Sequence, residues 1–218
     1  MILCVAIYSL FFSFLWLSKE KRVIRLFDSD GFTAHPVLLI LFHIAGILIF
    51  GFAPFLSGHE FSYLPVQQIA WIMILITITL VSFSIMISYH LASKKCNQFP
   101  ITSSLQIPGK FLITIYFIVR ILFICFYEIW FRGFLLNYGI DNLGILPAVL
   151  VNVGLYSLLH MVNGKEEMIS CIPFGFLLCY LSIWQGSALA AIVIHLALTI
   201  TYEFSFIKKI KTLQTAVI

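Results

Sequence analysis

The pattern of hydrophobic and polar residues along this chain predicts seven membrane-spanning helices. Seven apolar segments alternate with polar loops, and several approach the ~20 residues that a helix needs to cross a bilayer. The first, fifth and sixth segments are short, so we expect them to tilt little, to thin the bilayer locally or to be sheltered by neighbouring helices. The segments cover about residues 1–17, 37–56, 69–90, 111–136, 145–160, 168–184 and 187–206.

The composition excludes a soluble protein. Hydrophobic residues make up 61% of the 218 residues and charged residues only 10%, with a mean hydropathy of +1.07. Such a chain does not have enough polar side chains to cover a water-exposed surface. We therefore expect an all-α, polytopic membrane helix bundle whose main partner is the lipid bilayer.

Basic residues lie in every second loop, apart from two arginines inside the fourth segment. The positive-inside rule then predicts an N-terminus outside and a C-terminus in the cytoplasm. Membrane topology thus accounts for the net charge of +4, and we expect no nucleic-acid partner. The loop 18–36 either lies along the inner membrane surface or is a solvated connector. The loop cations are Lys19, Lys21, Arg22, Arg25, Lys94, Lys95, Lys110, Lys165, Lys208, Lys209 and Lys211.

Several polar residues interrupt the predicted spans, and charged ones at membrane depth are candidates for a functional site. Glu128 and Arg132 are four residues apart, on one face of the fourth helix. The ~1.5 Å rise per residue places Glu128 and His195 level, with His160 about two turns deeper. By the same count Arg120 and Glu203 both lie near the inner interface, where we expect a structural pair.

Three motifs on separate predicted helices resemble those of the CPBP family of CAAX-protease and bacteriocin-processing intramembrane endopeptidases. The motifs are Glu128-x-x-x-Arg132-Gly133, then Tyr156-x-x-x-His160, then His195-x-x-x-Thr199, which follows Gly186-Ser187. The resemblance covers about residues 110–205. It divides the chain into an N-terminal three-helix membrane region (1–105), a CPBP-like domain (106–206) and a cytoplasmic tail (207–218).

The resemblance implies hydrolysis of a peptide bond in a membrane-associated or lipidated peptide or protein, in a membrane that we expect to be a prokaryotic plasma membrane. In the family a glutamate and the second-motif histidine activate water, and the third-motif histidine stabilises the oxyanion. Carried over, these roles fall to Glu128, His160 and His195. Arg132, Tyr127, Tyr156 and Thr199 are the expected supporting or oxyanion-binding residues.

Two positions depart from the family pattern. Tyr127 replaces the first glutamate of the family's E-E-x-x-x-R motif, and Thr199 replaces an Asn or Asp. Neither hydroxyl is a general base at neutral pH. A catalytically silent, peptide-binding scaffold or immunity-type protein is therefore the first alternative, and a small transporter is a less favoured one.

Each candidate residue also has a structural interpretation. Glu128 and Arg132 could form an intramembrane ion pair without catalytic function, and His160 could be a solvated histidine at a helix end. His43 is expected to be a packing histidine with its hydrogen bonds satisfied. We expect no cofactor; zinc held by Glu128, His160 and His195 is the chemical alternative, although no tight metal-binding spacing occurs.

Overall fold

The computed structural model describes residues 2–19, 24–27, 32–33, 35–56, 71–98 and 107–217. Their regular elements are helices, which confirms the predicted all-α membrane bundle. Most of the loop 18–36, with Lys21 and Arg22, lies outside the described residues. The elements are α1 (Ile2–Lys19), α2 (Pro36–Leu56), α3 (Trp71–Gln98), α4 (Lys110–Glu128), a π-helix (Ile129–Leu135), α5 (Leu136–Leu143), α6 (Ile145–His160), a 3-10 turn (Met161–Asn163), α7 (Lys165–Gln185) and α8 (Leu189–Val217).

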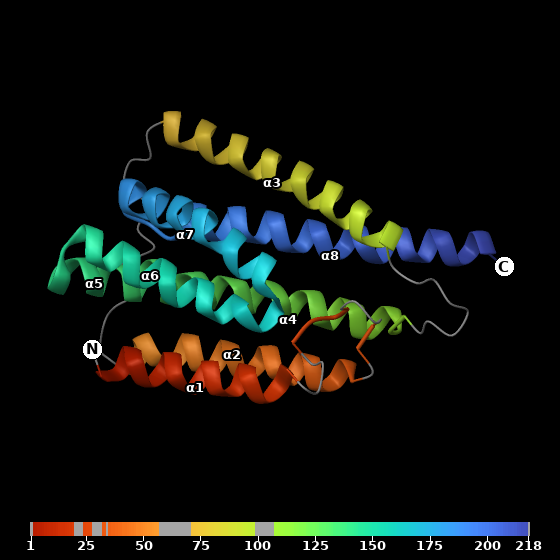
Figure 1. The fold of residues 1–218 in the computed structure, drawn as a ribbon, viewed down its shortest axis with the longest axis horizontal. Helices are drawn as coiled ribbons and strands as arrows, with labels where there is room; N and C mark the ends of the chain where they lie inside the picture. Colours follow the sequence, from red (N-terminus) through yellow and green to blue (C-terminus); the bar gives the residue numbers. More distant parts are fainter. Residues whose placement is uncertain are drawn as a thin grey trace.

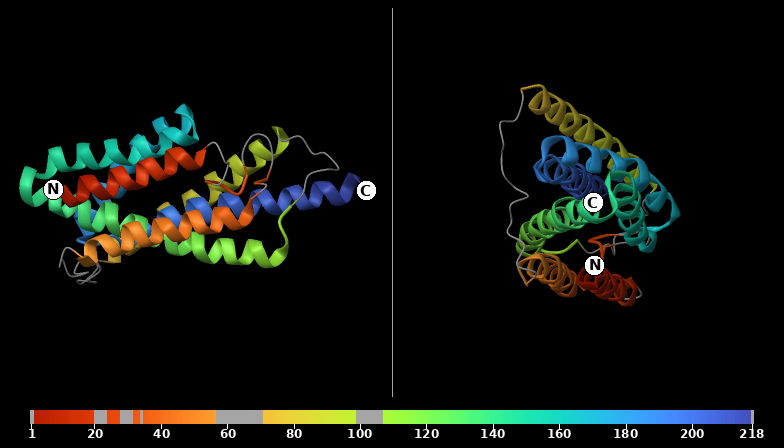
Figure 2. Two further views of the ribbon diagram at one scale, coloured as in Figure 1. Left: turned by 90° about the horizontal axis from the view of Figure 1, so that it is seen from below. Right: turned by 90° about the vertical axis from the view of Figure 1, so that its left-hand side faces the viewer.

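The helices pack side by side in pairs, with their axes roughly aligned. α3 runs along α8, α2 along α4, and α6 against α7 (Figure 1). α1 and α2 lie together on the side of the bundle opposite α3, as all three views agree (Figures 1 and 2). The two chain ends lie at opposite ends of the bundle. The stretch 207–217, expected as a tail, continues α8 as helix.

Within the described residues, five helical runs are long and apolar enough to cross a membrane. They are Trp71–Asn97, Lys110–Leu143, Ile145–Asn163, Lys165–Gln185 and Leu189–Thr215, and the shorter apolar helices are Cys4–Lys19 and Pro36–Gly51. Each of the seven overlaps one predicted segment, although several bounds differ by up to nine residues. The chain is an integral membrane protein, and its orientation stays a prediction.

The predicted fourth helix is not one regular α-helix. It changes to a π-helix directly after Glu128, a rare geometry that is frequent at functional sites. Asn152 of α6 holds this turn by donating from Nδ2 to the Phe131 carbonyl at 2.7 Å. Asn137, at the start of α5, donates from Nδ2 to the Gly133 carbonyl at 2.6 Å. These amides satisfy backbone oxygens that the irregular turn presents to its neighbours.

α4 and α8 run antiparallel and are joined by polar contacts at two levels. Glu128 meets His195 at one level, and Arg120 meets Glu203 at the other, with 3.4 Å between Nε and Oε1. Each pair of residues on one helix is eight apart, or about 12 Å along the axis. The acid belongs to α4 in the Glu128–His195 contact and to α8 in the Arg120–Glu203 contact. If one helix slid along the other, each acid would move away from its partner.

The Arg120–Glu203 contact confirms the expected pair. Tyr116 donates its hydroxyl to Glu203 at 2.9 Å, and Arg120 donates to Nε2 of His43 at 2.9 Å. His43 is fully buried, and its Nδ1 lies 2.8 Å from the Leu39 carbonyl. His43 is thus a satisfied packing histidine, as predicted.

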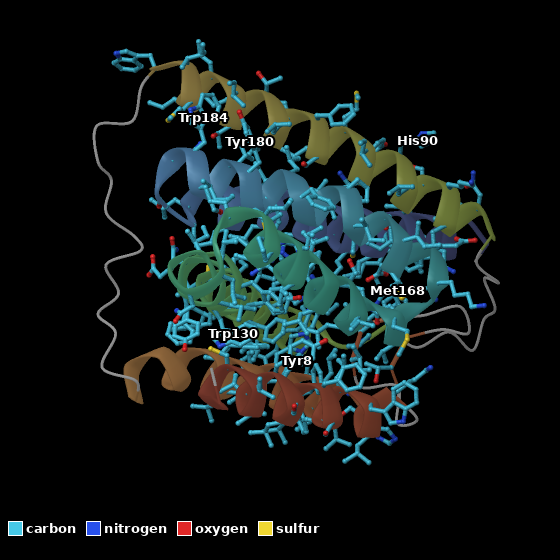
Figure 3. The ribbon with its side chains drawn as sticks, turned by 60° about the vertical axis from the view of Figure 1, so that its left-hand side comes forward. Tyr8, His90, Trp130, Met168, Tyr180 and Trp184 are labelled. Carbon is cyan, nitrogen blue, oxygen red and sulfur yellow. The ribbon has the colours of Figure 1, made fainter. Side chains whose placement is uncertain are left out.

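An aromatic core joins α1 and α2 to the site-bearing helices. Phe50 of α2 contacts the rings of Tyr127 and Trp130, with centroids 5.4 and 5.2 Å away. Tyr8 of α1 donates its hydroxyl to the Leu155 carbonyl of α6 at 2.9 Å. Figure 3 shows Trp130 and Tyr8 where the central helices face α1 and α2. The N-terminal helices therefore form part of the wall around the site.

We expect Gly46→Ala to weaken the packing of α2 on α4. A Cβ at Gly46 would lie 2.3 Å from the Phe123 ring, and overpacking of this kind costs about 1–3 kcal/mol. Thermal unfolding in detergent micelles should show a lower midpoint. Gly154→Ala is the matched control, because a Cβ there meets nothing within 4 Å. Equal midpoints for the two variants would contradict the close α2–α4 contact.

Candidate active site

Glu128 and His195 form a buried contact between α4 and α8. The Glu128 Oε1 lies 2.5 Å from the His195 Nδ1, and the carboxylate side chain is fully buried. Because a carboxylate only accepts hydrogen bonds, the proton of this contact lies on Nδ1, and Nε2 is left for other partners. The two residues are level, as the residue count predicts.

Arg132 lies on the other side of the same carboxylate. Its Nε is 3.5 Å from Glu128 Oε2, and both side chains are fully buried. The guanidinium carbon lies 4.4 Å from the centre of the Tyr156 ring, a cation–π contact. Neither Nη1 nor Nη2 has a hydrogen-bond partner within the part of the chain that the structure describes. The Arg132 charge is therefore balanced by Glu128 and by the Tyr156 ring.

His160, the last residue of α6, is paired with a second carboxylate. Its Nδ1 lies 2.8 Å from Oε1 of Glu167, the third residue of α7. The His160 side chain is 19% exposed, compared with 10% for His195. His160 is thus the more exposed of the two histidines.

The Tyr156 ring is close to both histidines. Its ring centre is 4.9 Å from that of His160 and 6.3 Å from that of His195. Tyr127 is buried beside them, with its ring 6.0 Å from His195. Its hydroxyl has no hydrogen-bond partner among the described residues. Thr199 follows His195 by one turn of α8 and is half-buried.

The structure therefore brings Tyr127, Glu128, Arg132, Tyr156 and His195 into one cluster, and His160 adjoins this cluster through the Tyr156 ring. In the described ranges no three His, Cys, Asp or Glu residues gather as a metal-binding group. Each of the two histidines contacts a carboxylate through Nδ1, and zinc held by Glu128, His160 and His195 stays the alternative prediction.

Sequence reasoning missed Glu167, the partner of His160, and the residues that contact Glu167. Asn163 donates from Nδ2 to Oε1 of Glu167 at 2.8 Å, and Arg25 donates to Oε2. The available signal was the Lys165-Glu166-Glu167 run directly after Gly164. The predicted sixth segment began at residue 168, whereas α7 begins at Lys165.

Residues 108–201 match the family model described as type II CAAX prenyl endopeptidase Rce1-like. This segment is similar to that family, and it is called the Rce1-like segment below. The predicted resemblance to the CPBP family is thereby confirmed over these residues, and the family supports CAAX-type intramembrane protease function in general terms. The Rce1-like segment contains all seven candidate site residues, from Tyr127 to Thr199. No curated protein and no solved structure matches the chain.

We expect Glu128→Gln to reduce the yield and thermal stability of the protein. The substitution leaves the fully buried Arg132 without its counter-charge, and breaking a buried ion pair costs about 3–5 kcal/mol. The double variant Glu128→Gln/Arg132→Met should recover part of this loss, because it removes both charges. Purification yield and unfolding midpoints in micelles measure both effects. Normal stability of the single variant would contradict a structural role for the pair.

Proposed function

We propose that this protein is an intramembrane endopeptidase that cleaves a peptide bond in a membrane-associated or lipidated peptide or protein. One observation carries the proposal. His160 and His195 both lie next to the Tyr156 ring, and each is held through Nδ1 by a carboxylate. Two histidines oriented in this way leave two Nε2 atoms for acid–base chemistry.

His160 takes the role of general base. Its greater exposure favours access of water, and its Nε2 accepts a proton as the water oxygen adds to the substrate carbonyl carbon. The proton then passes from Nε2 to the departing amine as the carbon–nitrogen bond breaks. A positioned histidine of this kind contributes about 10²–10⁴-fold to a rate.

His195 takes the role of oxyanion donor. When its imidazole is protonated, Nδ1 donates to Glu128 and Nε2 donates to the developing oxyanion. One oxygen of Glu128 accepts from the imidazolium Nδ1–H, and the other oxygen faces Arg132. The hydroxyls of Tyr127 and Thr199 supply further donors to the substrate or the oxyanion. In this account Glu128 acts through His195 and is not the base.

The location follows from the same features. The protein is embedded in the bilayer, and the positions of its loop cations favour an N-terminus outside and a C-terminus in the cytoplasm. The Rce1-like match favours substrates with a prenylated C-terminal segment. The proposed site contains no metal and no cofactor.

We expect purified protein to cleave members of a membrane-peptide library that includes prenylated peptides. His160→Ala and His195→Ala should each lower the rate at least ~100-fold, because each removes an acid–base or oxyanion group. His90→Ala is the matched control, since His90 is exposed on the outer side of α3 (Figure 3). Cleavage that survives both site substitutions rejects the assigned site. Stoichiometric zinc in mildly purified protein rejects the metal-free account.

A peptide-binding protein without hydrolytic activity is the second candidate, and Tyr127 favours it. This residue fills the position of the family's first glutamate with a buried aromatic ring. If the parent protein shows no hydrolysis and Tyr127→Phe abolishes its cellular function, the binding interpretation replaces the enzymatic one. The Tyr127 hydroxyl would then be a contact to the bound peptide.

A further inference from the structure

We infer that Glu167 is a positioning residue that orients and supports His160 as the general base, and that Arg25 holds Glu167 in place. The inference rests on the proposed function and deepens it. Its basis is a chain of contacts that begins before α2 and ends at the His160 ring. Arg25 contacts one oxygen of Glu167, and the other oxygen lies 2.8 Å from His160 Nδ1.

The contact selects one tautomer of His160. A carboxylate oxygen accepts a hydrogen bond and does not donate one, so the Nδ1 of His160 carries the proton. The lone pair of the neutral imidazole is then on Nε2, the nitrogen that the base role requires. Without Glu167, either nitrogen of His160 could carry the proton.

The two oxygens of Glu167 are held from different directions. Asn163 donates to Oε1, the oxygen that also meets His160, at 2.8 Å. Arg25 approaches Oε2 from the segment that follows α1. Glu167 also lies in the first turn of α7, where the helix dipole favours a negative charge. The carboxylate is thereby fixed in charge and in direction.

Glu167 supplies a carboxylate next to the base, which the tyrosine at position 127 cannot do. Tyr127 has no carboxylate to support a base, whereas Glu167 reaches His160 across the turn at Gly164. When His160 takes a proton from water, Glu167 stabilises the resulting imidazolium without taking the proton itself. The proton leaves with the amine product, and the His160–Glu167 pair returns to its starting state.

The test compares Glu167→Gln with Glu166→Gln in the full-length protein. Glu166 is the neighbouring acid in the same helical turn and is exposed, so its variant should keep the parent rate. Glu167→Gln should lower kcat about 100-fold with little change in KM, and Glu167→Asp should recover part of the loss. Arg25→Gln should give a smaller loss than Glu167→Gln. Equal kcat values for the two glutamine variants overturn the inference.

A spectroscopic measurement separates this inference from the proposed function. In ¹⁵N-histidine-labelled protein in nanodiscs, the His160 signals are identified by their absence from His160→Gln. The parent and Glu166→Gln should show a proton on Nδ1, and Glu167→Gln should show a mixture of tautomers. An unchanged tautomer in Glu167→Gln overturns the inference even if the parent cleaves peptides. A parent that fails to cleave rejects the proposed function, and the tautomer result then decides alone whether Glu167 positions His160.

Discussion

The burial of the Glu128 carboxylate is the constraint on which this structure depends. A carboxylate at the centre of a membrane protein is tolerated only when its oxygens are paired. Here one oxygen faces His195 on α8 and the other faces Arg132 on the π-helix. The same charge that fixes the packing of two helices also orients the third-motif histidine. Stability and the geometry of the site are therefore properties of one group.

The polar contacts at a second level between α4 and α8 explain why this packing is specific. In lipid, apolar helix faces have little preference for one register over another. The Arg120–Glu203 contact fixes the register at a level about 12 Å from Glu128, with the acid on the other helix. Because the acid is on α4 at one level and on α8 at the other, these contacts define both the antiparallel direction and the axial position. The aromatic core with α1 and α2 then packs against an α4–α8 pair whose register is fixed by these polar contacts.

Much of this arrangement was predictable from the sequence, because its causes are local or periodic. Hydrophobic runs predict the seven helices, and a constant rise per residue predicts that Glu128 meets His195 and that Arg120 meets Glu203. The π-helix was not predictable, because the Asn152 contact that holds it comes from a different helix. Glu167 was missed because a charged residue beside a span is usually assigned to the loop, whereas here it begins the helix. The assigned roles of the site residues stay predictions.

The contact between Arg25 and Glu167 links the Rce1-like segment to the N-terminal part of the chain. The Rce1-like segment begins at residue 108, yet the cation that holds the carboxylate beside His160 is more than eighty residues earlier in the chain. The segment is therefore not a self-sufficient module. Transplanted behind a different pair of N-terminal helices, it would keep every motif residue and lose the counter-ion of Glu167. Related chains that share only this segment need not share its electrostatics.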